Sequence, residues 1–242
     1  MKLKQLACLA ALSIPFSVQS DTLSVSVGGG AWNESPIGNF QKTIDAAEVN
    51  VGDNLFWDSE SQGYFFVTFE HFVPLIPNFR LIRTNLDHSG SGNATFSFAG
   101  QNFTGNVSND VSIETTDLIT YYEILDNVVS LDIGLNLRNL KVDYTINNGG
   151  NVTDSISATV PMLYAWVGAS PWPDLIISGE LSYIAFDGSS VSDFTAKVAY
   201  TTELFVGVEA GYRKQSFELD DISGTNANLD FDGVFAGAYL KF

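Results

Sequence analysis

Residues 129–138 read Val129-Ser130-Leu131-Asp132-Ile133-Gly134-Leu135-Asn136-Leu137-Arg138, with apolar and polar residues alternating throughout. Successive side chains of a β-strand point to opposite faces, so this pattern predicts a strand with one apolar face and one polar face. Similar alternation recurs in residues 175–183, 194–200 and 204–213, and no stretch has sustained helical periodicity. The chain is therefore predicted to be all-β.

Turn residues divide the chain into about ten expected strands, within a range of about eight to twelve. Short connections at residues 74–78, 126–127, 170–174 and 201–203 alternate with long, polar ones at 34–61 and 220–228. Short turns at one end and long loops at the other are typical of a closed antiparallel transmembrane β-barrel. The expected strands are residues 22–33, 62–73, 79–99, 102–125, 128–147, 151–168, 174–187, 191–201, 203–219 and 229–242.

A soluble β-sandwich also alternates with period two, so the placement of charge has to separate the two architectures. A membrane barrel keeps its lipid-facing surface free of charge over about 25 Å. Here the polar faces are rich in Gly and Ser, and this distribution favours the barrel. The acids concentrate in expected loops, for example at Glu34, Asp45, Glu48, Asp53, Asp58 and Glu60.

Aromatic residues near the expected strand ends suit the two girdles that flank the apolar band of a membrane barrel. The alternative is that strands simply favour aromatic residues. The residues concerned are Trp32, Trp57, Tyr64, Tyr121, Tyr122, Tyr164, Trp166, Trp172, Tyr200 and Tyr212.

Residues 1–20 have the features of a secretory signal peptide: Lys2 and Lys4, an apolar stretch, and small residues before Asp21. Cys8 could instead mark a lipoprotein, but the apolar run continues past it. We expect an exported chain whose residues 21–242 form an integral outer-membrane barrel. Cleavage would remove the single cysteine and two lysines, leaving 9 basic and 28 acidic residues. This acidic balance argues against nucleic acid as a partner.

The last expected strand ends the chain on Phe242, with Val234, Ala236, Ala238 and Leu240 on the same apolar face. A terminal Phe on such a strand resembles the signal by which outer-membrane proteins are recognised by the barrel-insertion machinery. Leu240 and Phe242 are therefore the expected assembly signal.

Three segments resemble a family of uncharacterised proteobacterial outer-membrane β-barrel proteins: residues 69–78 (FEHFVPLIPN), 121–127 (YYEILDN) and 211–221, which contain GYR and LDD. The resemblance runs from the signal peptide to Phe242. Members of that family usually have proline where this chain has Phe72. The resemblance implies the fold and the outer-membrane location, and it carries no activity, ligand or catalytic residue.

If the apolar faces meet lipid, the polar faces bring charges of both signs into the barrel interior. An isolated buried charge is costly, so we expect these charges to pair. A barrel of about eight to ten strands is narrow enough to be filled by side chains, which predicts a plugged interior without an open pore or cofactor. The residues expected in this interior charge network are Glu70, Glu123, Asp132, Arg138, Glu180, Lys197, Glu209, Arg213 and Lys241.

Candidates for chemistry are few. Ten-stranded omptin-like proteases use paired aspartates and an Asp-His pair, and lipid-modifying barrels use His with Ser or Asp. His71 is expected at an interfacial turn. His88 lies between Asp87 and Ser89, near the outer half of the long strand expected at residues 79–99. Adjacent strand residues face opposite ways, so Asp87 cannot orient His88, and surface turn chemistry is expected there instead of catalysis. The pairs Asp220-Asp221 and Asp230, Asp232 could bind a divalent cation or simply be solvated.

Three functions remain open. Mixed-sign interior charge favours a non-catalytic structural or surface-interaction protein with acidic extracellular loops. A narrow channel for a small solute is one alternative, and an outer-membrane hydrolase or lipid-modifying enzyme is the other. The expected partners are outer-membrane lipid and lipopolysaccharide.

Overall fold

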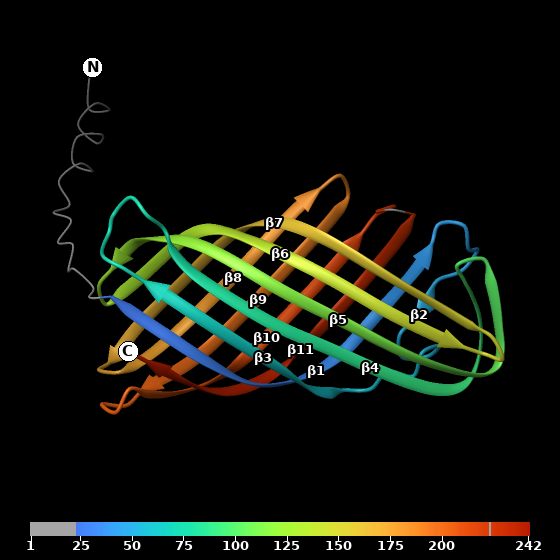
Figure 1. Ribbon diagram of the computed structural model, residues 1–242, viewed down its shortest axis with the longest axis horizontal. Coiled ribbons are helices and arrows are strands. Elements are labelled where there is room, and N and C mark those ends of the chain that lie inside the picture. The colour runs from blue at the N-terminus through green and yellow to red at the C-terminus, as the bar shows by residue number, and fades with distance from the viewer. Residues whose placement is uncertain (1–22, 223) are drawn as a thin grey trace, which may run out of the picture.

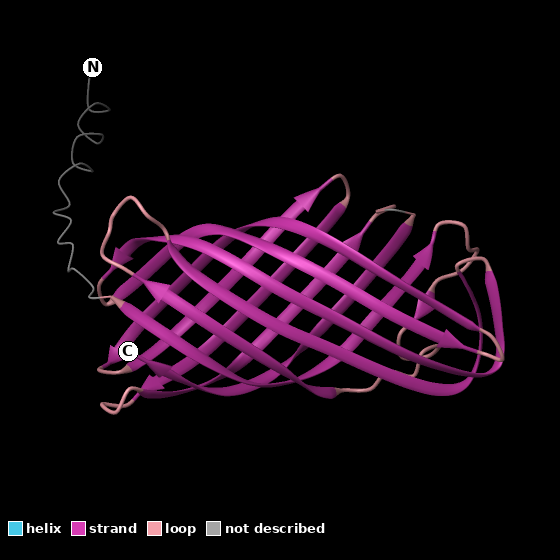
Figure 2. Cartoon of the chain, in the orientation of Figure 1, coloured by secondary structure: helices cyan, strands magenta, loops and turns pink. Residues whose placement is uncertain are grey.

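A computed structural model describes residues 23–222 and 224–242, so the predicted signal peptide, residues 1–20, lies outside the described residues. The chain forms a closed antiparallel barrel of ten long strands, each paired with its neighbour, in which β11 pairs back with β1 (Figures 1 and 2). The predicted fold class is confirmed. The barrel strands are β1 (Ser24–Lys42), β3 (Glu60–Glu70), β4 (Asn78–Phe98), β5 (Gln101–Asp126), β6 (Val129–Asn147), β7 (Asn151–Trp172), β8 (Leu175–Phe186), β9 (Ser189–Thr201), β10 (Val206–Leu219) and β11 (Thr225–Lys241).

Within the described residues there is no helix long and apolar enough to span a membrane.

The first strands differ from the expected boundaries. Residues 34–42 were expected in a long loop, yet they continue β1 and pair with residues 225–233 of β11. Only residues 43–59, which we call the plug loop, leave the barrel wall. They include the short strand β2 (Val49–Asn50), which pairs with Asn39 and Phe40. The alternation of apolar residues is lost in residues 34–42, which explains why the sequence pattern did not reveal this part of the strand.

In the half of the barrel that holds the start of β1 and the C-terminus, the outward-pointing side chains form an apolar band around the wall. Ile133 is 50% exposed and Leu163 is 68% exposed, as expected for residues that meet lipid instead of packing in a core. A closed barrel has no free edge, so every backbone polar group within the band can be paired along the wall. The band and the closure together give an integral barrel of the outer-membrane type. Other outward apolar residues are Phe65, Leu118, Leu135, Ile177, Leu181, Val198, Val208 and Val234.

β4 to β7 continue beyond the other strands at the end opposite the start of β1 and the C-terminus (Figure 1). In this extension the outer face of the strands is polar, whereas in the band it is apolar. The four outward residues of one cross-strand row are Arg83, Thr116, Asn139 and Thr159, and every row beyond this one is polar on the outside. The inner face of the same strands is mostly apolar, and it is buried except on β7, where Ile156 and Ala158 are exposed. We call this part, residues 83–98, 101–116, 139–147 and 151–159, the extracellular sheet. A polar exterior over an apolar interior is the pattern of a sheet in water, so the Arg83 row marks the outer boundary of the membrane.

The expected aromatic girdles are only partly present. Tyr122, Trp172, Tyr200 and Tyr212 face outward. The other six aromatic residues point inward: five lie on the same strand faces as the polar network, and Trp57 enters the lumen from the plug loop. These six are Trp32, Trp57, Tyr64, Tyr121, Tyr164 and Trp166.

Candidate functional site inside the barrel

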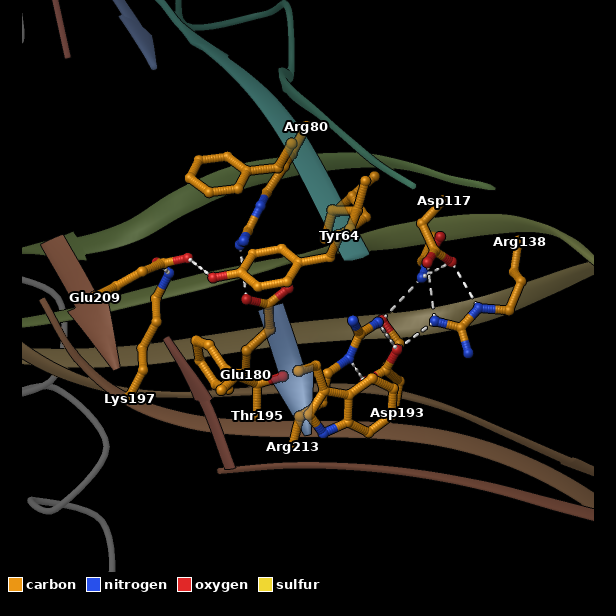
Figure 3. A pocket seen from close by; sticks show the side chains of 17 residues that line it. Tyr64, Arg80, Asp117, Arg138, Glu180, Asp193, Thr195, Lys197, Glu209 and Arg213 are labelled. Atoms are coloured by element: carbon orange, nitrogen blue, oxygen red, sulfur yellow. Dashed lines mark hydrogen bonds and ion pairs between the residues drawn. The ribbon is translucent and has the colours of Figure 1, made fainter. Parts of the chain in front are cut away.

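An ion-paired layer crosses the middle of the barrel (Figure 3). Arg138 on β6 donates from Nε to Asp117 Oδ1 (2.7 Å) and from Nη2 to Asp117 Oδ2 (2.9 Å). Arg213 on β10 donates from Nη2 to Asp193 Oδ2 (2.7 Å), and Asp193 also pairs with Arg138. Gln215 adds a hydrogen bond of 2.8 Å to the same carboxylate. The charges of the layer therefore compensate one another across four strands.

Strand register explains why these side chains meet. Asp117 lies directly opposite Arg138 in the β5–β6 pair, and Asp193 lies opposite Gln215 in the β9–β10 pair. Paired residues of antiparallel strands point to the same face, so each acid enters the lumen beside its partner. The sequence reasoning included Arg138 and Arg213 but missed Asp117 and Asp193. The signal was present, because Leu118 and Phe194 next to them continue the apolar outer face.

A second ion-paired group lies nearer the termini. Lys197 donates to Glu209 (2.7 Å), which also accepts a hydrogen bond from Tyr64 Oη (2.7 Å). Arg80, which the sequence reasoning also missed, pairs with Glu180 (2.6 Å). The space left between the two groups is about 40 Å³. A water needs about 10 to 15 Å³ by this measure, so this space has room for two or three waters.

At the periplasmic end the expected pairing fails. Glu70 accepts a hydrogen bond from Tyr121 (2.9 Å), and Glu123 accepts one from Asn78 (2.8 Å). Asp132 forms no ion pair with any described residue, and the ion pairs among residues 23–222 and 224–242 do not include Lys241, which is exposed. The expectation of a single network is wrong for Asp132 and Lys241. Water reaches this mouth, so charges there need no partner to be tolerated.

The outer part of the lumen holds a buried acid-base pair. His88 Nε2 lies 3.0 Å from Glu34 Oε1, and neither side chain is exposed. The imidazole lies between Trp57 and Phe231, with ring centroids at 4.9 and 5.8 Å. The structure corrects two expectations, because His88 is not in a surface turn and Glu34 is not in a loop. Asp87 does point to the other face, where Ser112 donates to it. The acid beside His88 comes instead from β1, which no local pattern could indicate.

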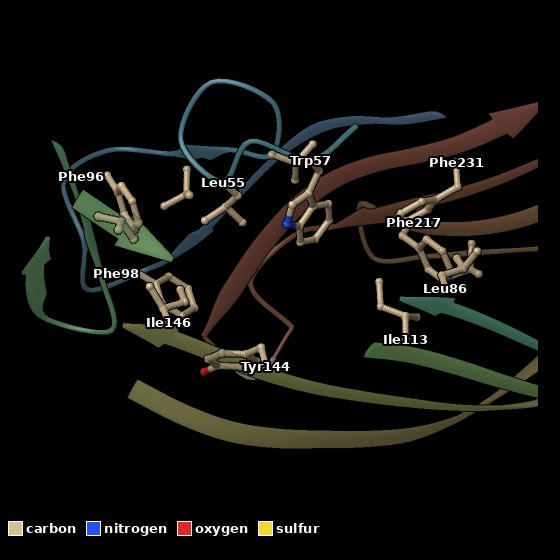
Figure 4. Close-up of a cluster of buried hydrophobic side chains, with 14 of the residues drawn as sticks. Leu55, Trp57, Leu86, Phe96, Phe98, Ile113, Tyr144, Ile146, Phe217 and Phe231 are labelled. Carbon is tan, nitrogen blue, oxygen red and sulfur yellow. The ribbon is translucent and has the colours of Figure 1, made fainter. Parts of the chain in front are cut away.

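The plug loop fills the lumen above this pair. Leu55 and Trp57 are buried among residues of the extracellular sheet such as Phe96, Phe98 and Ile146 (Figure 4). Trp57 Nε1 donates to Asn109 Oδ1 (2.7 Å), and Asn109 Nδ2 donates to the carbonyl of Leu55 (2.8 Å).

Two further contacts fix the position of the plug loop. The carboxylate of Asp45, which was expected to be a solvated loop acid, accepts hydrogen bonds from the backbone N–H groups of Ala99 (2.7 Å) and Gly100 (2.9 Å) at the β4–β5 turn. The loop also approaches Gly90 so closely that a Cβ there would collide with the carbonyl oxygen of Leu55. The loop is therefore a fixed part of the core and closes the outer half of the lumen.

The remaining candidates have structural partners. His71 Nδ1 accepts a hydrogen bond from the N–H of Val73 in the periplasmic turn. Asp230 pairs with Lys214 (2.8 Å), and Asp232 accepts a hydrogen bond from Tyr212 (2.6 Å). Across residues 23–222 and 224–242, no group of three His, Cys, Asp or Glu side chains is placed to hold a metal ion.

No protein-family model and no curated protein matches the sequence. The structure is similar to that of the outer membrane protease OmpT from Escherichia coli, with a TM-score of 0.55 and 9% identity over 93% of this chain and 98% of that chain. The structure is less similar to the translocator domain of autotransporter NalP from Neisseria meningitidis, with a TM-score of 0.41 and 10% identity over 97% of this chain and 93% of that chain. Ail, the attachment invasion locus protein of Yersinia pestis, gives a TM-score of 0.40 at 12% identity, over 92% of this chain and 100% of that chain. At these identities the likeness shows the fold alone: this chain is a closed β-barrel of the outer-membrane type.

Proposed function

We propose that the protein is a closed, non-catalytic barrel that displays its extracellular sheet to molecules outside the cell. One observation carries the proposal: the lumen is occluded at two levels. The ion-paired layer around Arg138 and Asp193 fills the middle, and the plug loop with Leu55 and Trp57 fills the outer half. A solute would have to disrupt both levels to pass.

Conductance tests the closed lumen. The mature protein inserted into a planar lipid bilayer should give no steady current steps. Replacing residues 44–58 by a short Gly-Ser linker should leave it silent, because the middle layer remains. Adding Arg138→Ser, Asp193→Ser and Arg213→Ser to that linker variant should open a pore. Steady conductance in the unaltered protein would refute the proposal in favour of a solute channel.

The buried state of the Glu34–His88 pair supports a non-catalytic role. A general base must reach the proton that it abstracts, within hydrogen-bonding distance or through one water. His88 lies between Trp57 and Phe231 and is 2% exposed, so no substrate reaches it in this arrangement. The purified protein should hydrolyse neither lipid nor peptide substrates. An activity that disappears in His88→Ala while the barrel stays folded would show that the protein is an enzyme.

We also propose three contacts in the envelope. The apolar band suits lipid, and in the outer leaflet it suits the acyl chains of lipopolysaccharide. The insertion machinery would read the end of β11. Phe242 exchanges backbone hydrogen bonds with Val25 (2.9 Å each), while its ring is 64% exposed beside Phe205. An exposed terminal ring at the closing strand is available for recognition before and after closure.

A further inference from the structure

Strand β7 has an open edge in the extracellular sheet. It pairs with β6 from Asn151 to Ala169 but with β8 only from Leu163 onward. Residues 151–162 therefore have a neighbour on one side alone. At about 3.3 Å per residue this edge is about 40 Å long. Alternate residues of a strand direct their N–H and C=O groups away from the paired neighbour, so the edge carries a row of donors and acceptors that have no strand partner. Within this segment the N–H of Ser155 donates to the side chain of Asp154 (2.8 Å).

Little of the described chain covers this edge. Residues 153–159 are all exposed, and outside the strand ladders no backbone hydrogen bond between described residues reaches residues 151–162. The opposite edge of the same sheet, on β4, is treated differently. There Gln62 donates to the carbonyl of Asp87 (2.7 Å), and the plug loop packs along the strand at Gly90.

The β7 edge lacks the usual protection against pairing over most of its length. Exposed edges are commonly blocked by Lys, by Pro or by a bulge. Residues 151–160 contain no Lys, Arg or Pro, and Asp154 is their only charge, whereas Pro161 lies at the base of the edge, beside the point where β8 begins to pair. Val, Ile and Thr, which favour strands, are frequent there. The edge is therefore a preformed template for one more strand.

We propose that the β7 edge binds an extended peptide segment of an external protein by adding it as a strand to the extracellular sheet. This inference rests on the proposed display function and names the part of the sheet that acts. The inner face of β7 offers Ile156, which is 37% exposed, and the exposed Ala158, so the added strand should place apolar side chains on that face. Its alternate residues should be polar and point outward, in line with Ser155 and Ser157.

The charge around the edge selects a basic segment. Across β4 to β7, the outer surface of the sheet is hollowed into a groove of about 620 Å³ whose lining includes the outward residues Asp87, Asp110 and Asp143. Asp154 also lines this groove, but it lies on the inner face of β7 opposite Tyr144. Lys141, which pairs with Asp143, is the nearby cation on this surface. A peptide with Lys at its outward positions therefore complements the surface, whereas an acidic peptide is repelled.

A second copy in the same membrane suits the edge less well. Two copies related by a twofold axis along the membrane normal carry β7 in the same direction relative to the membrane, so their edges cannot meet antiparallel. Barrel strands are also tilted by about 35° to 45°, and two such edges would cross. The β4 edge of a neighbouring copy is contacted near its base by Gln62.

Binding of an acetylated ten-residue peptide of alternating Val and Lys to the mature protein in micelles tests the proposal. We expect saturable binding and slower amide exchange confined to residues 151–160. The same peptide with N-methyl groups on alternate residues keeps its side chains but loses its donors, and it should not bind. A Val-Glu peptide should bind at least about tenfold more weakly, because the surface is acidic.

Two proline variants locate the site on the protein. Ser157→Pro and Ala158→Pro change adjacent residues, whose N–H groups point to opposite sides of the strand. One variant therefore removes an N–H that points to the open edge, and the other removes a hydrogen bond of the β6–β7 ladder. Heat-dependent gel mobility identifies the variant that still folds, and that variant should bind the Val-Lys peptide about five- to tenfold more weakly. Asn228→Ala, at an exposed position of β11 away from the edge, serves as the control and should bind the peptide normally.

No binding, equal binding of the N-methylated peptide, or unchanged binding in the folded proline variant would overturn the proposal. Peptide-independent dimers that are lost in that variant would overturn it in favour of a second copy. If the protein shows no conductance in a planar bilayer, any of these results refutes only the proposal that the β7 edge binds a peptide. Steady conductance refutes the proposed display function itself.

Discussion

Asp193 is the carboxylate on which the middle layer of the barrel depends most. It accepts hydrogen bonds from Arg213 Nε (3.0 Å) and Nη2 (2.7 Å) and from Gln215 (2.8 Å), and it pairs with Arg138. In Asp193→Ala, Arg138 keeps Asp117, but Arg213 keeps no carboxylate partner and retains its hydrogen bond to Thr84 (2.9 Å) and its contact with the Trp32 ring (5.0 Å to the centroid). A buried guanidinium loses its countercharge, and removing one partner of a buried ion pair costs about 3 to 5 kcal/mol.

Urea titration of folding into lipid vesicles, followed by tryptophan fluorescence, measures this cost. The control is Glu114→Ala, which removes the exposed Arg83–Glu114 pair (2.8 Å) and should cost about 0 to 1 kcal/mol. Asp193→Leu combined with Arg213→Met should recover much of the loss, because well-packed apolar residues can replace a buried pair. Equal costs for Asp193→Ala and Glu114→Ala would show that the layer is hydrated and that the lumen is open.

Three other perturbations test the face assignment, the closure and the assembly signal. Ile133→Arg puts a charge in the lipid-facing band and should cost about 2 to 4 kcal/mol in the same titration, whereas Asp132→Asn at the watery mouth should be milder; a small penalty for Ile133→Arg would favour a soluble sheet. The unheated protein should migrate faster on a gel than the boiled protein, because the membrane-spanning part of the barrel is closed and has no edge from which unfolding begins, and identical mobility would argue against closure. Deleting Phe242 should lower the amount of folded protein in the outer membrane without reducing export, and normal surface levels would remove the assembly-signal argument.

Alternation alone was enough to identify most of the barrel strands. Ile133 and Asp132 show why. One face of the strand must be apolar to meet lipid and the other polar to line the lumen, so apolar and polar residues alternate along the sequence. The same logic missed residues 34–42 as part of a strand. It identified the outer parts of β4 to β7 as strands but did not reveal that their polarity is reversed. Those parts stand in water, where the polar face turns outward and the apolar face turns inward, so the rule used for the membrane band no longer holds.

The site was harder to anticipate than the fold. Strand faces placed Arg138, Glu180, Lys197, Glu209 and Arg213 in the lumen, but they could not say which charges would meet. Pairing depends on register and on the height of each side chain in the barrel. Arg80 therefore meets Glu180, Asp193 meets two arginines, and Asp132 and Lys241 remain at a wet mouth where no partner is required.

The sequence by itself determined the all-β class, the barrel and its approximate strand number, and the face that meets lipid, because each of these follows from local periodicity. Only the tertiary structure decided that the plug loop folds into the lumen, that Glu34 lies beside His88, and that β7 ends in an open edge. These features depend on where residues distant in sequence arrive after the barrel closes, and on the unequal heights of neighbouring strands. Neither is encoded in the pattern of any one segment.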